Sequence, residues 1–91
     1  MSEPVIPFAI LNRYLDMLRE NYDYYHTGPV CNTTDPTHPN HLAWMLNELA
    51  MMEDREKAMR WLGFVQGVII SNGLTTVDAE RDFTRPYFKK D

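Results

Sequence analysis

The sequence is poor in cysteine and serine, and it has no long apolar run. Cys31 is the single cysteine among the 91 residues, so no disulfide can form within the chain, as is typical of proteins from reducing compartments. No window approaches the roughly 18 uncharged apolar residues that a membrane-spanning helix needs. The first ten residues carry no basic leader, so we expect a cytoplasmic protein that is neither secreted nor anchored in a membrane.

Basic residues are scarce in the first part of the chain. Residues 1–54 hold eight acidic side chains but only Arg13 and Arg19, whereas residues 55–91 hold seven basic and five acidic ones. The net charge of -4 argues against nonspecific binding to nucleic acid or to an anionic membrane surface. An acidic half suits a basic partner surface, although solvated faces of surface helices have the same composition.

The pattern of apolar residues predicts helices. Apolar side chains recur at spacings of three and four over residues 7–25, 41–52 and 57–73, and a shorter helix is expected at about 76–82. A chain of this size is close to the lower limit at which one core is stable without disulfides, metals or a partner. The predicted fold is therefore all-α, a small helical bundle forming one domain over residues 1–91, with a long loop at about 26–40 and an irregular tail at about 83–91.

Local sequence signals predict where the helices begin and end. Thr37 or Asn40 is an acceptable N-cap for the second helix, and Asp54 for the third. Gly73 predicts the end of the third helix, and Thr75 the start of the fourth through a variant of the capping box. The short connection between the second and third helices predicts an antiparallel αα-hairpin.

Two rows of residues are expected to form packing faces. Leu11, Leu15 and Leu18 belong to an a/d stripe on the first helix. Gly63 and Gly67, one turn apart in the third helix, each cost about 1 kcal/mol in helix propensity relative to alanine. Close packing against the first helix or against a second copy of the chain would offset this cost. We therefore expect a homo-oligomer, most simply a homodimer; a ligand groove along the glycine row is the alternative.

The sequence contains no established catalytic or metal-binding pattern. Five residues of the types that bind zinc gather in or beside the long loop: His26, Cys31, Asp35, His38 and His41. Their spacing matches no close pair such as C-x2-C or H-x3-5-H, so capping or surface histidines are the simpler interpretation. Neither Ser2 nor Ser71 has a histidine and a carboxylate near it in sequence. We expect no catalytic residues, no metal and no cofactor.

Two surfaces are candidates for binding a partner. On the first helix, Asp16, Glu20 and Asp23 lie off the a/d stripe and are expected to face a basic protein. The tail has the aromatic and cationic residues that could stack a base and hold a phosphate. These tail residues are Arg85, Tyr87, Lys89 and Lys90. Aromatic packing at the end of the bundle accounts for them without a ligand.

Three stretches within about residues 41–82 form a recognisable pattern, HLAWMLNEL, EKAMRWLGFVQGVI and GLTTVD. They resemble small proteins of no settled activity that are encoded by tailed phages and prophages. In that group a His-Leu-x-Trp-Met helix precedes a Lys-Ala-x-Arg-Trp-Leu-Gly-Phe-x-Gln-Gly helix. The resemblance implies a phage accessory protein and brings no catalytic residues with it. Because a small helical protein without catalytic residues acts through its surface, we expect it to bind and modulate a host or bacterial defence protein in the host cytoplasm, masking a basic site on that partner.

A looser likeness, in architecture alone, extends to the helical-hairpin phage proteins that sequester cyclic nucleotide signals of bacterial immunity. It is carried by a short helix, an acidic turn and a longer helix, and no ligand residue follows from it. The likeness implies an alternative function, the sequestration of a small nucleotide between protomers. Aromatics and cations that converge in a pocket between chains would favour the nucleotide, whereas a flat patch with carboxylates would favour a protein partner.

Overall fold

The computed structural model describes residues 4–22 and 29–88, and these residues form four helices and no strand. The helices are α1 (Phe8–Asn21), α2 (Pro39–Leu49), α3 (Arg55–Ser71) and α4 (Val77–Phe88). The all-α class is therefore confirmed. Among the described residues, no helix combines the length and the apolar character that crossing a bilayer requires.

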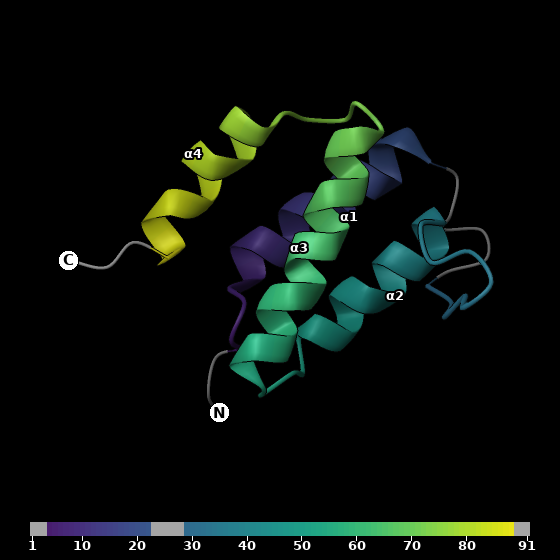
Figure 1. The fold of residues 1–91 in the computed structure, drawn as a ribbon, viewed down its shortest axis with the longest axis horizontal. Coiled ribbons are helices and arrows are strands. Elements are labelled where there is room, and N and C mark those ends of the chain that lie inside the picture. The colour runs from purple at the N-terminus through teal and green to yellow at the C-terminus, as the bar shows by residue number, and fades with distance from the viewer. Residues whose placement is uncertain (1–3, 23–28, 89–91) are drawn as a thin grey trace.

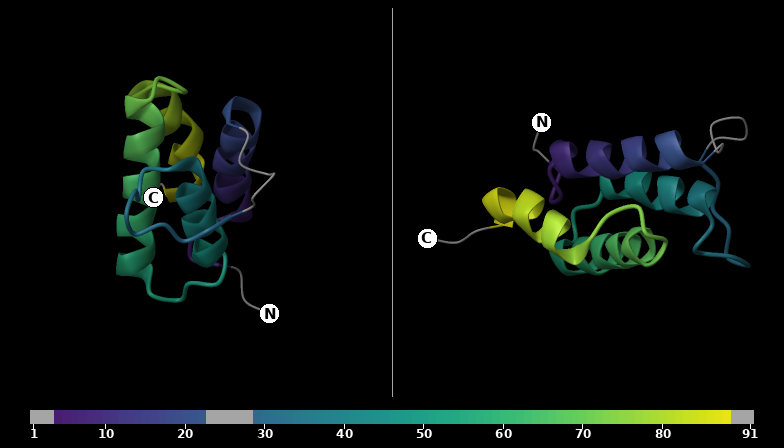
Figure 2. Two further views of the ribbon diagram at one scale, coloured as in Figure 1. Left: turned by 90° about the vertical axis from the view of Figure 1, so that its right-hand side faces the viewer. Right: turned by 90° about the horizontal axis from the view of Figure 1, so that it is seen from above.

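α2 lies between α1 and α3 and packs against both (Figures 1 and 2). Buried apolar residues recur at helical spacing on the inner face of each helix, which is why the three helices share one core. These residues are Ile10, Leu11, Tyr14 and Leu18 of α1, Leu42, Ala43, Met45, Leu46 and Leu49 of α2, and Ala58, Leu62, Val65 and Ile69 of α3. Ile6, just before α1, completes the cluster.

The leucine stripe of α1 packs in the core of its own chain. Leu11 and Leu18 are fully buried, and Leu15 is half-buried against the same cluster. α1 ends at Asn21 because Tyr22 adopts an extended backbone, although its N–H still donates to the Leu18 carbonyl oxygen. The helix is thus shorter than the expected 7–25, and residues 23–28 lie outside the described part of the chain.

Of the N-caps predicted for α2 and α3, the one for α3 is confirmed and the one for α2 is wrong. Asp54 caps α3 as predicted, since its carboxylate accepts a hydrogen bond from the Lys57 N–H at 3.1 Å. α2 is capped by His38 in place of Thr37 or Asn40. The His38 Nδ1 accepts from the Asn40 N–H at 3.1 Å, so a ring nitrogen fills the role that a short side-chain oxygen usually has.

The fourth helix is longer than predicted. The sequence predicts a helix over about 76–82 followed by an irregular tail, but α4 continues to Phe88 with Pro86 inside it. A proline near the C-terminal end of a helix removes one backbone hydrogen bond without interrupting the turns before it. Phe83 and Tyr87, one turn apart, have ring centroids separated by 5.7 Å, and this contact supports the last turn.

The glycine row lies on the outer face of α3. Gly63 and Gly67 are exposed, and no atom of the described residues lies within 4 Å of the position that a Cβ would take, outside the helix's own backbone and chain neighbours. The expected packing of this row against the first helix is therefore wrong, because α3 buries its opposite face, which carries Leu62 and Val65. Packing against a second copy of the chain stays a prediction.

Replacing Gly67 with alanine is expected to stabilise the monomer. The added methyl group meets no atom, and alanine is favoured over glycine in a helix by about 1 kcal/mol, which raises Tm by roughly 4–8 °C in a domain of this size. The matched control is Gly73→Ala, which should lower Tm because the φ of 78° is strained for alanine. Thermal melts followed by circular dichroism measure both. If the Gly67→Ala variant is more stable than the parent at low protein concentration but less stable than the parent at high concentration, a second copy of the chain packs on this row.

Candidate functional site

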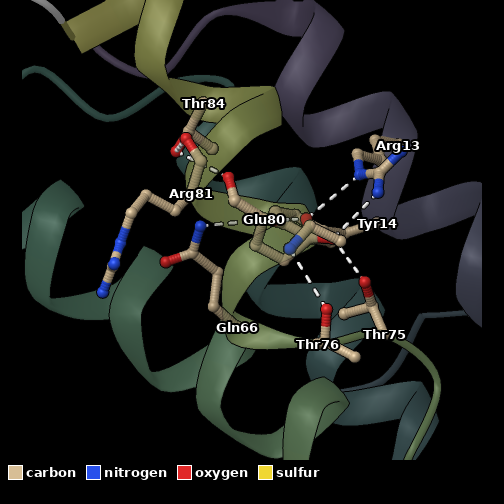
Figure 3. A network of polar contacts seen from close by, with 9 residues as sticks. Arg13, Tyr14, Gln66, Thr75, Thr76, Glu80, Arg81 and Thr84 are labelled. Atoms are coloured by element: carbon tan, nitrogen blue, oxygen red, sulfur yellow. Dashed lines mark hydrogen bonds and ion pairs between the residues drawn. The ribbon is translucent and has the colours of Figure 1, made fainter.

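α4 contacts the rest of the molecule through the partly buried rings of Phe83 and Phe88 and through one buried carboxylate. Glu80 is the one buried residue of α4 among those described, with only 3% of its surface exposed. Arg13 of α1 donates to it twice, from Nε to Oε1 at 3.0 Å and from Nη2 to Oε2 at 2.8 Å (Figure 3). A guanidinium matches both oxygens of a carboxylate in this way, so the contact fixes orientation as well as distance.

Three more side chains complete this polar contact. The Tyr14 hydroxyl donates to Glu80 Oε1 at 2.7 Å and accepts from Gln66 Nε2 at 2.8 Å, and the Thr75 hydroxyl donates to Oε2 at 2.6 Å. The group Arg13, Tyr14, Gln66, Thr75 and Glu80, here called the Glu80 cluster, thus joins α1, α3, α4 and the segment that precedes α4. Thr75 was expected to cap α4, but Thr76 does so instead, accepting the Ala79 N–H at 3.1 Å.

The Glu80 cluster holds its members in fixed charge states at neutral pH. Burial by itself would raise the pKa of Glu80, but the hydrogen bonds from Arg13, Thr75 and Tyr14 outweigh burial and lower the pKa to about 2. The hydrogen bond to Glu80 raises the pKa of Arg13, while burial and then the same carboxylate raise the pKa of Tyr14. A general acid or base works best with a pKa near the operating pH, so this arrangement is suited to structural attachment rather than to proton transfer.

The Glu80 cluster places α4 alongside α1, and a groove of about 480 Å³ lies between them. The Arg13 guanidinium lies 4.5 Å from the ring centroid of Phe83, which fixes that ring at the groove wall. The lining residues are Ala9, Asn12, Arg13, Asp16, Met17, Glu20, Phe83 and Tyr87. Ala9 and Tyr87 also line a neighbouring hollow with Pro4, Pro7 and Phe8. We call the two together the α1–α4 groove.

The structure brings together residues from the two surfaces that the sequence suggested. Asp16 and Glu20 of α1 and Tyr87 of α4 line the same groove, and all three are exposed. Arg85 is also exposed, and its Nη2 lies 3.4 Å from an oxygen of Asp82. The other candidates of these surfaces, at positions 23, 89 and 90, lie outside the described residues.

A second surface feature, which the sequence did not indicate, lies where α2 meets α3. Trp44 and Trp61 are half-buried with ring centroids 5.7 Å apart, and the Lys57 Nζ lies 5.3 Å from the Trp61 ring centroid. The ring centroids of His41 and Trp44 are 5.4 Å apart. We call these four residues the tryptophan corner. Only the pairing of α2 with α3 shows that Trp44 and Trp61 meet at a partly exposed site.

Two of the three histidines in or beside the long loop make structural hydrogen bonds, and the third, at position 26, lies outside the described residues. His38 caps α2, and the buried His41 accepts the Asn32 N–H through Nδ1 at 2.8 Å. Cys31 is exposed as a free thiol. Within residues 4–22 and 29–88, no group of three or more His, Cys, Asp or Glu side chains is placed to hold a metal ion.

Comparison with known proteins gives no relative from which a function could be transferred. No protein-family model matches the sequence, and neither a curated protein nor a solved structure does. The fold and the surfaces define a small all-α protein with a polar attachment for α4, an acidic and aromatic groove, and an aromatic corner with one cation.

The Glu80 cluster should make the stability of the protein depend on acid pH. The folded-state pKa of Glu80 is about 2 against an ordinary 4.5, so its contribution is fully present above pH 4.5 and is lost as pH falls towards 2. The loss is on the order of 3 kcal/mol. Urea unfolding at successive pH values should show the parent losing stability across this interval. Glu80→Gln should start less stable at pH 7 and lose less on acidification, and equal losses would contradict this role for Glu80.

Proposed function

We propose that this protein is a phage accessory protein that acts by binding a host or bacterial defence protein through its α1–α4 groove. The observation that supports this most directly is the meeting of Asp16 and Glu20 with Tyr87 in one groove. Exposed carboxylates beside an aromatic ring suit a partner surface that is basic and partly apolar. The phage context and the host cytoplasm rest on the sequence resemblance.

The negative charge of the groove suits a protein that covers a basic site on its partner. The positive charge of Arg13 is held against Glu80, and the Asp16 carboxylate lies 3.0 Å from Arg19 at an exposed site. An exposed ion pair of that kind is weak, so Asp16 can exchange its partner at little cost. A basic site on another protein would therefore find two carboxylates available, and their field would speed its approach.

Reversing the charge of the groove should slow association with the partner. In Asp16→Lys/Glu20→Lys, both positions are exposed, so the free energy of unfolding should change by less than about 1 kcal/mol in total. The association rate, measured by surface plasmon resonance at low salt, should fall by about tenfold or more, because steering by charge acts mainly on that rate.

The matched control is Glu53→Lys/Glu56→Lys, which reverses two exposed charges, one in the connection between α2 and α3 and one in the first turn of α3. The control should associate at the rate of the parent. If both double variants slow association equally, the net charge of the molecule is responsible and the groove is not the binding surface.

A second candidate function is the sequestration of a small nucleotide between the protomers of a homodimer. The observation that favours it is the tryptophan corner, where an exposed lysine accompanies two aromatic rings. Rings of this kind stack bases, and a cation beside them can hold a phosphate. The tail is a poorer place for such a ligand, because Tyr87 shares its groove with two carboxylates, which repel a phosphate.

The two candidates are separated by titration with cyclic di-AMP in a calorimeter. If a nucleotide is the ligand, Lys57→Glu should weaken binding by about tenfold or more, since it replaces an attraction to phosphate with a repulsion. Tyr87→Ala, on the groove, should bind as the parent does. Absence of heat with the parent protein, or equal binding by parent and Lys57→Glu, would remove the tryptophan corner as a site for this nucleotide.

A further inference from the structure

The two ends of the α1–α4 groove differ in chemistry. One end is apolar, where Phe8 is 55% exposed and Tyr87 43% exposed beside Pro4 and Pro7. The other end carries the carboxylates of Asp16 and Glu20, with Met17 and Phe83 between the helices. Both ends lie along one face of α1, so a single ligand lying parallel to that helix would meet both.

We infer that this groove binds a short extended segment of the partner that carries one large apolar side chain followed or preceded by two basic residues. The inference rests on the proposed function and specifies the part of the partner that is bound. The apolar side chain packs between Phe8 and Tyr87, and the basic side chains pair with Asp16 and Glu20. Charge complementarity at one end and apolar contact at the other commit the groove to this occupant.

The spacing of the groove residues sets the spacing in the ligand. Phe8 and Asp16 are eight positions apart on α1, which at about 1.5 Å per residue is roughly 12 Å. An extended chain covers that distance in about four residues, at about 3.3 Å each, and side chains an even number of positions apart point to the same side of it. Asp16 and Glu20 are one turn apart, about 6 Å, or about two residues of extended chain. The expected ligand has its apolar residue four positions from the first basic residue and six from the second, so that all three side chains face the groove.

The middle of the groove excludes other classes of ligand. The Arg13 guanidinium already donates to both oxygens of Glu80 and lies against the Phe83 ring, so it offers little to an anion. A phosphate chain would meet the carboxylates of Asp16 and Glu20, which repel it. A wholly apolar segment would remove water from these carboxylates without supplying hydrogen bonds in its place, and this desolvation is unfavourable. Arginine is favoured over lysine in the ligand, because its fork pairs with a carboxylate through two bonds.

The test uses the full-length protein and fluorescein-labelled peptides, with binding followed by fluorescence anisotropy. The probe peptide has one leucine, three alanines, one arginine, one alanine and one arginine in that order, and a second peptide has the reverse order. One of the two should bind. Replacing both arginines of the bound peptide with glutamate should abolish binding, and inserting four glycines after the leucine should weaken it by about fivefold.

The affinity of the bound peptide for variants of the protein tests whether it binds in the α1–α4 groove. Asp16→Asn/Glu20→Gln should weaken it by about fivefold, as expected for the loss of two exposed charge pairs, and Tyr87→Ala should weaken it as well. Glu53→Gln/Glu56→Gln is the matched control and should bind as the parent does. Circular dichroism should show the same helix content in every variant, because all these positions are exposed.

Three results would overturn the inference. They are binding that survives both groove variants, binding that ignores the charge of the peptide, and absence of binding by both peptide orders. The proposed function fails separately, when the charge reversal at Asp16 and Glu20 leaves the association with the captured partner unchanged. If neither peptide binds while that reversal does slow association, the groove still binds the partner, but through a surface other than an extended basic segment.

Discussion

The bidentate contact between Arg13 and Glu80 is the interaction on which the arrangement of α4 depends. α1, α2 and α3 share an apolar core, but α4 buries a carboxylate and no large apolar side chain completely. A buried carboxylate is unfavourable unless its oxygens are paired, and here a guanidinium and two hydroxyls pair them. α4 therefore has one position in which this charge is satisfied. The groove beside it exists because that position lies along α1.

This dependence explains why the helices of the core were predictable from sequence and the groove was not. The core positions of α2 and α3, such as Leu46 and Val65, follow from helical spacing, and Asp54 acts as a cap because capping is a local property. Arg13 and Glu80 are separated by 67 positions, and nothing in the sequence near either residue indicates the other. Local patterns can predict a helix and its inner face, but not which distant charge that face meets.

The errors made from sequence have physical causes of the same kind. The sequence predicted an irregular tail from about residue 83, but Pro86 lies in the last turns of α4, where one missing hydrogen bond is tolerated. The glycine pair suggested a close neighbour within the chain, but the apolar face of α3 that includes Leu62 is the one that meets the core, and the glycines lie opposite. The glycines were therefore informative about the backbone and not about what surrounds it. Asp16 and Glu20 were identified as exposed because they lie off the a/d stripe, which is again a local property.

The polar attachment of α4 also affects how its release could be observed. The denaturant dependence and the heat capacity change of unfolding both scale with the apolar surface that becomes exposed. Because α4 contributes a satisfied charge and only partly buried rings to the fold, its separation from α1 would expose little such surface. Calorimetry and urea titration would then report mainly on the core of α1, α2 and α3. Hydrogen exchange at the amides of residues 77–88 would detect the same event directly, since the α4 backbone bonds open whether or not apolar surface is exposed.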